Sequence, residues 1–594
     1  MINNYKKFYY LLEPAERKKT FSLSLLILTM AMVDVVGVAS IMPFIAVLTN
    51  PELLNTNKFL AALRGSMNFM NQENFLFFLG VTVFVLLISS LALKAFTNYA
   101  QVKFTHYCEH NISKRLIEGY LHQPYSWYLS NNTANLGKNI LSEVAIVSNG
   151  MMHLMLLTAQ CVVVLALCIL LLIVDPVLVT TLAVLLLIGY GSIIRLFKKL
   201  LFSMGKESAD ANQLRYRVVN EAFGAIKEIK FIGIEDIYTE KFSKPSEIYA
   251  RHQSIAHVVG QMPKFALEAI AFGGMILVVL YLMSAKGGFA ASLPIITLYA
   301  FSAYRLMPAI QQIYSSYTQL NFITPSLDSL YRDLIGIKII GNKNTAEDIK
   351  FSNLMALRKI EYRYPNSPQP TIKSLDMAIP VNSSTGIVGF SGCGKSTIVD
   401  IMLGLINPQR GEITIDGKVI DSRSIRSWRE LIGYVPQQIY LTDDTVAANI
   451  AFGLEPKNFD YEAIIRAAKI ANLHDFIVND LPEKYNTTLG ERGIRLSGGQ
   501  RQRIGLARAM YRNPQVLILD EATSALDNLT EKIVMDAVNK LLKKLTVIIV
   551  AHRLTTVQEC DQIYLVDEGR IVGRGTYSEL LKNNDYFQRL INQE

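Results

Sequence analysis

The chain has 594 residues, of which 51% are hydrophobic, 18% are charged and five are cysteines. A single hydrophobic core stops growing near about 250–300 residues, so this length predicts at least two domains. The formal net charge is +9. In so apolar a chain, a basic excess is typical of the cytoplasmic loops of a membrane protein. This interpretation disfavours a nucleic-acid partner. The odd cysteine number, without paired spacing, indicates neither a disulfide framework nor a metal cluster.

Apolar stretches long enough to cross a bilayer dominate the first half of the chain. A hydrocarbon core of ~30 Å requires about 20 helical residues. Asp175 and Pro176 divide one long apolar run into two spans, and Pro176 suits the first turn of the following helix. The six predicted spans are residues 20–48, 75–99, 151–174, 177–194, 265–283 and 289–313.

The same hydropathy pattern predicts the domain boundaries. We expect a transmembrane domain over residues 1–320, a polar linker over 321–350 and a soluble domain over 351–594. The first apolar run lacks a small-residue cleavage site, so it is expected to be a retained anchor and not a signal peptide.

The connections between the spans predict the orientation of the chain. Those at 100–150 and 197–264 are long and rich in lysine and arginine, so the positive-inside rule places them in the cytoplasm. Their helical composition predicts legs of about 35 Å with tips near 123–132 and 233–238. We expect a multi-pass protein of the cell inner membrane, with both termini and the soluble domain cytoplasmic. The apolar face within 51–74 fits either an external helix on the membrane surface or a short helix packed on neighbouring spans.

The soluble domain contains a glycine-rich segment, GFSGCGKS, that fits a P-loop. It follows the apolar residues 384–388 and leads into a helix-like segment, 397–405. Glycines let backbone N–H groups surround a phosphate at a helix N-terminus, while Lys395 adds positive charge and the Ser396 hydroxyl suits Mg²⁺. Taken alone, the motif also fits a glycine-rich turn. The residues predicted to bind ATP here are Ser391, Gly392, Cys393, Gly394, Lys395, Ser396 and Thr397.

Two further apolar segments end in polar side chains. Residues 516–519 lead into Asp520 and Glu521, and residues 547–551 lead into His552. Because parallel strands end at a common sheet edge, these side chains are expected near the P-loop. Asp520 is the predicted Mg²⁺ ligand, Glu521 the predicted general base towards water, and His552 the predicted contact to the γ-phosphate. A lone histidine is more often structural.

The segment LSGGQ, followed by DEATSALD, resembles the motifs of the ABC ATPases. With the six spans included, the resemblance covers the whole chain and implies an exporter: an all-α polytopic membrane domain followed by an α/β P-loop ATPase domain. It implies that Tyr364 stacks on adenine and that Gln437 joins Mg²⁺ to the transmembrane legs. Glu491, Arg492 and Gly493 resemble a loop typical of exporters.

The resemblance also implies a dimer with two composite ATP sites. In such proteins the signature residues of one chain close on ATP that the P-loop of the other chain holds. Both halves are intact in this sequence, so we expect a homodimer, with a heterodimer as the alternative. The residues assigned to this half of the site are Ser497, Gly498, Gly499, Gln500 and Asp527.

Three basic residues lie in or at the edge of predicted spans: Lys94, Lys264 and Arg305. A charge at mid-bilayer is unfavourable by at least ~2.5 kcal/mol, so each is expected to face a cavity or to reach the membrane surface. Glu268, one turn from Lys264, is placed to neutralise it. In a dimer the three would supply six charges suited to phosphate or diphosphate. Asp34, in the first span, is either an interhelical contact or a cavity group.

Residues 40–48, 262–272 and 304–308 resemble the bacterial lipid-linked oligosaccharide flippases. The resemblance implies ATP-driven flipping of a polyprenyl-diphosphate oligosaccharide to the outer leaflet, with a membrane lipid or lipid-linked glycan as substrate. Lysine stands at two positions where that family has arginine, which weakens bidentate phosphate recognition. The alternative is export of another lipid, a drug or a peptide, and six spans argue against an ATPase without transport.

Overall fold

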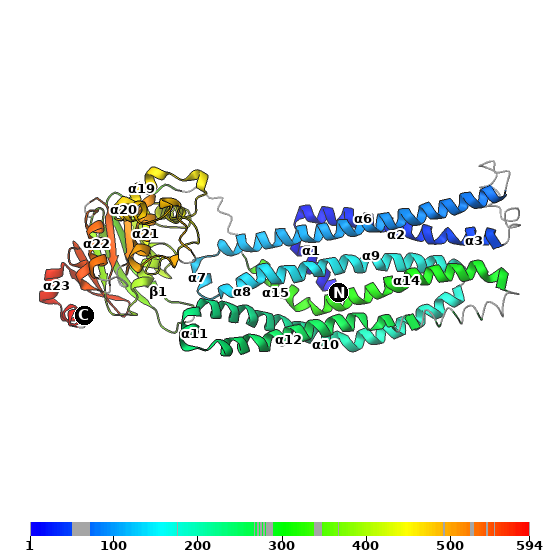
Figure 1. The fold of residues 1–594 in the computed structure, drawn as a ribbon. Coiled ribbons are helices and arrows are strands. Elements are labelled where there is room, and N and C mark those ends of the chain that lie inside the picture. Colours follow the sequence, from blue (N-terminus) through cyan, green and yellow to red (C-terminus); the bar gives the residue numbers. More distant parts are fainter. Residues whose placement is uncertain are drawn as a thin grey trace. The chain divides into compact units, whose positions relative to one another are not determined.

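The computed structural model describes two compact units of the chain (Figure 1). The first comprises Met1–Gln123 and Asn131–Ile340, and the second comprises Pro124–Ser130 and Gly341–Glu594. The described residues are 2–49, 72–174, 176–265, 268, 269, 273, 276, 280, 289–337, 347–365, 367–490, 493–522, 528–541, 544–551 and 553–592.

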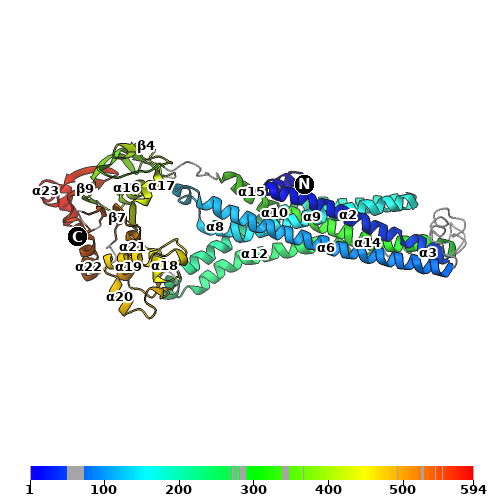
Figure 2. The same cartoon turned by 90° about the horizontal axis from the view of Figure 1, so that it is seen from above.

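The first unit is helical throughout its described residues, and its long helices run side by side (Figures 1 and 2). Its elements are α1 (Ile2–Leu11), α2 (Pro14–Ala39), α3 (Ile41–Thr49), α6 (Gln72–Leu121), α8 (Thr133–Lys138), the π-helical turn η1 (Asn139–Glu143), α9 (Val144–Val174), α10 (Pro176–Gly224), α11 (Ile226–Ile232), α12 (Glu235–Gln261), α14 (Phe289–Phe322) and α15 (Thr324–Gly336).

Three stretches within the described residues are long and apolar enough to cross a membrane: Pro14–Leu48, Glu73–Leu121 and Thr133–Ile173. They contain or overlap the first three predicted spans. The first predicted span is interrupted at Ser40, where α2 ends and α3 begins. The fourth and sixth predicted spans lie in α10 and α14, whereas most of the fifth lies outside the described residues, as does most of the segment 51–74.

The long connections continue the membrane helices as single helices. The 50 residues of α6 give a length of about 75 Å, more than twice a bilayer core of ~30 Å. Near the first predicted tip, α6 ends at Leu121 and the short helix α7 (Tyr125–Tyr128) follows. Near the second, α11 ends at Gly233, whose φ of 73° is left-handed and stops the helix. Helix α9 ends at Val174 and α10 starts at Pro176, and Asp175 lies outside the described residues.

The predicted linker, residues 321–350, was too long. Helix α15 occupies its first half and packs in the first unit, where Leu327 and Leu330 are fully buried. Two side-chain contacts also fix it to α1: Asn4 Nδ2 donates to Thr324 Oγ1 at 2.9 Å, and Lys7 pairs with Asp328 at 2.5 Å. The polar composition of this segment belongs to the exposed face of an amphipathic helix, which made it resemble a linker.

The second unit is α/β, as predicted. Its six-stranded sheet has the order β10-β9-β3-β8-β7-β6, and all pairs are parallel except β9 with β10. A four-stranded antiparallel sheet has the order β2-β1-β4-β5. The strands are β1 (Leu354–Tyr362), β2 (Ile372–Pro380), β3 (Ser384–Val388), β4 (Arg410–Ile415), β5 (Lys418–Val419), β6 (Ile432–Val435), β7 (Val516–Asp520), β8 (Thr546–Val550), β9 (Gln562–Asp567) and β10 (Arg570–Gly575).

Helices cover both faces of the parallel sheet. Strands β3, β7 and β8 are buried at every residue, and alternate residues of β7 and β8 pack into two different hydrophobic clusters. Continuous apolar runs are what strands buried on both faces require. The helical elements are α7, α16 (Lys395–Met402), α17 (Ile425–Glu430), α18 (Val446–Ile450), η2 (Pro456–Asn458), α19 (Tyr461–Ile470), α20 (His474–Asn479), η3 (Lys484–Asn486), α21 (Gly498–Tyr511), α22 (Asn528–Asn539), η5 (Leu554–Val557), α23 (Tyr577–Asn583) and α24 (Asp585–Ile591).

Candidate nucleotide site and membrane cavity

The P-loop connects the buried strand β3 to the N-terminus of α16. A Cβ atom at Gly389 would lie 2.1 Å from the Val566 carbonyl oxygen, so only glycine fits there. Gly394, the N-cap of α16, has a φ of 108°, which also favours glycine. Lys395 is 5% exposed, and its ammonium donates to the carbonyl oxygens of Gly389 at 2.7 Å and Phe390 at 3.2 Å. The backbone at this helix N-terminus is therefore already shaped as an anion cradle.

Cys393 lies inside this cradle but does not act as a nucleophile. Its side chain is buried, and burial raises the pKa of the thiol even though the Lys395 charge acts in the opposite direction. A thiol with a raised pKa stays protonated near neutral pH. An ATP contact at this position remains a prediction, and it would involve the loop backbone.

Two carboxyl groups lie where β7 ends beside α16. Burial, followed by the charge of Glu521, raises the pKa of Asp520. Burial and the charge of Asp520 together raise the pKa of Asp400 on α16 to about 6. Tyr434 donates its hydroxyl to Asp520 Oδ2 at 3.4 Å. A divalent cation would stabilise both carboxylates, so this donor set fits Mg²⁺.

The remaining Mg²⁺ candidates are Ser396 in the first turn of α16 and Gln437 after β6. The described part of the chain has no group of three or more His, Cys, Asp or Glu that could hold a metal ion. This is compatible with Mg²⁺, which usually takes only one or two carboxylates and completes its shell with substrate phosphates and water. The predicted set of Ser396, Gln437 and Asp520 is therefore chemically suitable but needs the nucleotide.

Glu521 follows β7 in a left-handed backbone conformation with a φ of 46°. Its N–H extends the parallel ladder by donating to the Val550 carbonyl at 3.0 Å. Its carboxylate accepts a hydrogen bond of 2.5 Å from the Gln437 side chain. A non-glycine residue in this region is strained by about 1–3 kcal/mol. The structure thus brings together the predicted base and the predicted glutamine.

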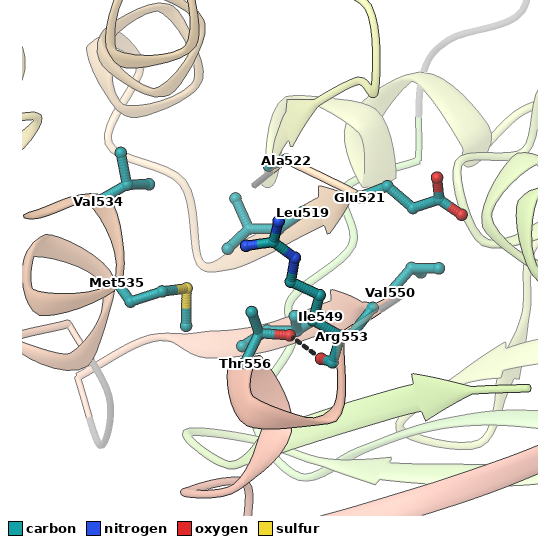
Figure 3. Close-up of a pocket in the computed structure, with 10 residues that line it drawn as sticks. Leu519, Glu521, Ala522, Val534, Met535, Ile549, Val550, Arg553 and Thr556 are labelled. Carbon is teal, nitrogen blue, oxygen red and sulfur yellow. Dashed lines mark hydrogen bonds between the residues drawn. The ribbon is translucent and has the colours of Figure 1, made fainter. Parts of the chain in front are cut away.

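A cavity of about 20 Å³ lies behind Glu521, between β7, β8 and α22 (Figure 3). Leu519, Met535, Ile549 and Arg553 are among its lining residues, and the Glu521 carboxylate points away from Arg553. A space of this size holds about one water molecule. It is therefore too small to be the nucleotide pocket.

The signature segment forms the start of the 14-residue helix α21. Ser497 is its N-cap: the hydroxyl accepts from the Gln500 N–H at 3.2 Å, and the Ser497 N–H donates to Gln500 Oε1 at 2.8 Å. A capped helix N-terminus of this kind favours a negatively charged ligand. In the described residues, the recorded side-chain contacts of these two residues do not reach the P-loop. Gly498 and Gly499 occupy the first turn of the same helix.

Several predicted residues lie outside the described residues, so their placement stays a prediction. They are His552, Asp527 with the preceding residues 523–526, and Glu491 with Arg492. Gly493 of the exporter-type loop is described and has a φ of 66°.

Sequence reasoning missed Arg508, which fixes the orientation of the signature helix. Its guanidinium donates to the carbonyls of Asn449 and Tyr440, both at 2.8 Å, and to the Asn449 side chain at 3.1 Å. It also stacks over the Phe452 ring at 4.5 Å. Burial lowers the pKa of Arg508 to about 10. An arginine on the buried side of an otherwise apolar helix face was the only sequence signal.

In the first unit, Lys94, Lys264 and Arg305 line one cavity of about 890 Å³. The three residues are far apart in sequence, and the structure brings them together as predicted candidates for substrate contact. The Lys264 side chain is 57% exposed and its ammonium lies 3.9 Å from Glu268 Oε1. The Arg305 side chain is only 14% exposed.

Asp34 is the partner of Arg305. Arg305 Nη2 lies 3.3 Å from Asp34 Oδ1, and Ser90 donates its hydroxyl to the same oxygen at 2.6 Å. Asp34 is thus an interhelical contact, and its partner Arg305 lines the cavity. The two roles that the sequence offered for Asp34, interhelical contact and cavity group, are therefore combined.

Residues 28–308 match the ABC transporter transmembrane region, and residues 372–524 match the ABC transporter domain. The chain belongs to the ABC transporter family. It combines one transmembrane region with one ATPase domain, the arrangement of an ABC exporter half-transporter.

Relatives of this ABC transporter include proteins with different cargoes. It is 45% identical over 238 residues to the ATP-dependent lipid A-core flippase of Saccharophagus degradans, covering 40% of each chain. It is 45% identical over 240 residues to ABC transporter B family member 22 of Arabidopsis thaliana, covering 40% of this chain and 19% of the relative. With ABC-type transporter MDR1 of Aureobasidium melanogenum, identity is 42% over 236 residues, covering 40% and 17%. The chain spans less than half the length of these relatives.

Among solved structures, a bacterial Atm1-family ABC exporter with ATP bound has a TM-score of 0.78 to this chain. The match covers 98% of this chain and 99% of that chain at 21% sequence identity. At this identity the similarity concerns the fold, which confirms a helical membrane domain followed by an α/β nucleotide-binding domain.

The position of Tyr364 gives a testable prediction for nucleotide binding by this ABC transporter. Its hydroxyl lies 3.1 Å from Thr397 Oγ1 in the first turn of α16, and its ring meets the Tyr362 ring edge-on at 5.1 Å. If the ring stacks on adenine, Tyr364→Ala should weaken ATP binding about tenfold, measured by titration of the full chain. Tyr364→Phe keeps the ring and should bind nearly normally. Equal losses in both variants would show that the hydroxyl contact matters and not the stacking.

Proposed function

We propose that this ABC transporter uses ATP hydrolysis to flip a polyprenyl-diphosphate oligosaccharide from the inner to the outer leaflet of the cell inner membrane. The observation that carries the proposal is the position of Lys94, Lys264 and Arg305 around one cavity. Cations at membrane depth are unfavourable unless a function retains them, and this cluster suits a phosphate-bearing headgroup.

The size of the cavity agrees with this substrate class. About 890 Å³ falls within the range of small-ligand pockets and accommodates a diphosphate with its adjoining groups. The two lysines act as point charges, whereas the Arg305 fork offers bidentate hydrogen bonds to phosphate oxygens.

The second unit supplies the ATPase chemistry. Lys395 and the P-loop backbone would bind the phosphates, while Glu521 acts as the base and Gln437 orients it. Ser396 and Asp520 would hold Mg²⁺, which supplies charge neutralisation at the phosphates. Because ATP in this family lies between a P-loop and a signature helix, we propose a homodimer with two equal sites.

A second candidate is export of a different amphiphile, such as a lipid A-type glycolipid, a drug or a peptide. The names of the relatives favour this candidate, since one is a lipid A-core flippase and another an MDR1 transporter. Charge separates the proposal only from export of a neutral drug, which gains nothing from the three cations.

Reconstitution in proteoliposomes tests the proposal. A fluorescent polyprenyl-diphosphate oligosaccharide should become inaccessible to an external quencher or enzyme only when ATP is present. The test variant is the double change Asp34→Asn with Arg305→Gln, because removing Arg305 alone leaves a buried carboxylate uncompensated, at about 3–5 kcal/mol. Transport should fall about tenfold in the double variant. Equal loss of lipid-free ATP hydrolysis would indicate a structural role for Arg305 and contradict the phosphate contact.

A further inference from the structure

A carboxylate, a hydroxyl and a guanidinium from three helices meet inside the membrane unit. Asp34 lies on α2, Ser90 on α6 and Arg305 on α14. Both neighbours contact Asp34 Oδ1, at 2.6 Å from the Ser90 hydroxyl and 3.3 Å from Arg305 Nη2. The side chains of Asp34 and Arg305 are 5% and 14% exposed. Charges this deeply buried interact strongly because water screens them little.

Packing between α2 and α6 holds the carboxylate in this position. The two helices lie close together here: a Cβ added at Gly37, one turn after Asp34, would be in van der Waals contact with the Leu87 side chain at 3.6 Å and the Ser90 Cβ at 3.9 Å. Ala31 and Val38, on neighbouring turns of α2, are also buried. Asp34 therefore cannot leave Arg305 for solvent without disturbing this helix contact.

The three cations of the cavity differ in how far they are neutralised. Arg305 is buried beside Asp34, while Lys264 is half-exposed and only loosely paired with Glu268. Lys94 has no ion pair with any described residue, and its side chain is exposed. An anion in the cavity can therefore pair with Lys94 without breaking an ion pair of the described residues, whereas it gains Arg305 only by separating that residue from Asp34.

We propose that Asp34 is an internal competitor that an anionic headgroup must displace from Arg305, so that Asp34 sets the selectivity of the cavity. This inference rests on the proposed function, because it assigns a specificity role within the same cavity. The exchange is non-covalent: a phosphate oxygen replaces the carboxylate oxygen at the guanidinium, and Asp34 keeps the Ser90 hydroxyl. Phosphate and diphosphate form charge-assisted bonds strong enough to compete, whereas headgroups without an anionic oxygen do not displace Asp34 from Arg305.

Asp34→Asn is the direct test, since it keeps the shape of the side chain and an oxygen for the Ser90 hydroxyl while removing the competing charge. The purified full chain is titrated with three probes: farnesyl diphosphate, dodecyl phosphate and uncharged dodecyl maltoside. We expect the variant to bind both anionic probes about five- to tenfold more tightly than the unmodified chain, and the uncharged probe equally. The readouts are the Kd from calorimetry and the half-maximal concentration for stimulation of ATP hydrolysis.

Three further variants separate competition from a purely structural role. Ser90→Ala removes the other donor to Asp34 and so strengthens its hold on Arg305; it should shift anion affinity in the opposite direction, towards weaker binding. Glu268→Gln makes the same carboxyl-to-amide change in the same cavity on a looser, more exposed pair, so its effect should stay within about twofold. Asp34→Asn combined with Arg305→Gln should lose the gain completely.

The outcomes distinguish the inference from the proposed function. Anion binding by Asp34→Asn that is equal to or weaker than that of the unmodified chain, in a variant that still hydrolyses ATP, overturns the competitor role. If Asp34→Asn does not fold because Arg305 is left unpaired, unchanged or tighter anion binding by Ser90→Ala overturns it instead. If Asp34→Asn binds both anionic probes more tightly but proteoliposomes do not flip the lipid-linked glycan, the competitor role stands and only the proposed cargo is wrong. If neither the unmodified chain nor Asp34→Asn binds an anionic probe, the competitor role and the proposed function are both overturned.

Discussion

Glu521→Gln should lower ATP turnover by about 10²–10⁴-fold, the usual contribution of a positioned general base. The hydrogen bond from the Gln437 amide to the Glu521 carboxylate, 2.5 Å long, can be kept by the amide oxygen of the new side chain. The backbone bond from residue 521 to the Val550 carbonyl is likewise unaffected. The substitution therefore removes basicity and leaves the geometry in place, so ATP binding should persist and trap a nucleotide-bound dimer.

The measurement is steady-state ATP hydrolysis at saturating ATP, together with the oligomeric state in ATP. Glu568→Gln is a matched control, because Glu568 also has a left-handed φ, of 41°, yet its side chain is 83% exposed and points to a surface lysine. That control should hydrolyse ATP normally. Retained turnover in Glu521→Gln would identify a different residue as the base.

Arg508→Ala should destabilise the ATPase unit by about 3–5 kcal/mol. Three hydrogen bonds to Asn449 and Tyr440 disappear, buried Asn449 loses a charged donor to its carbonyl and its side chain, and the partly exposed Phe452 ring loses the stacked guanidinium. Because α21 starts at the signature Ser497, displacement of this helix should also abolish ATP hydrolysis.

Chemical denaturation of the full chain, followed by a signal from the ATPase unit, measures this effect. Arg512→Ala is the matched control: it lies at the end of the same helix but is exposed, so its cost should stay within about 0.5 kcal/mol. Arg508→Lys keeps the charge and loses the planar guanidinium, so its stability should lie between that of the unmodified chain and that of Arg508→Ala. Lost hydrolysis with unchanged unfolding would show that Arg508 acts on the nucleotide and not on the helix.

The nucleotide half of the fold could be predicted from the sequence because its signals are local. Strands β7 and β8 are mainly apolar runs and β3 ends in Ile387 and Val388, and each strand leads directly into a segment with its own motif. In a parallel sheet the ends of such strands converge, so the neighbourhood of Lys395, Asp520 and Glu521 follows from strand order alone. The long legs were similarly predictable from helical composition on both sides of the membrane boundary.

The features that sequence reasoning missed depend on contacts between distant residues. Asp34 and Arg305 are each visible as charges in apolar segments, but only tertiary packing shows that they neutralise one another. The composition of helix α15 resembles that of a linker because its polar face dominates, although Leu327 and Leu330 are buried. The left-handed backbone of Glu521 has no sequence signal, since glutamate gives no sign of a positive φ.

The left-handed backbone at Glu521 lowers the stability of the ATPase unit at the position of the proposed base. Glycine adopts a φ of 46° without the side-chain clash that glutamate suffers, so the ATPase unit is less stable by about 1 kcal/mol than its backbone would permit. Because Glu521 is the proposed base, screening position 521 for thermostability is expected to select variants that no longer hydrolyse ATP. Engineering a sturdier form of this transporter has to exclude that position and gain its stability elsewhere.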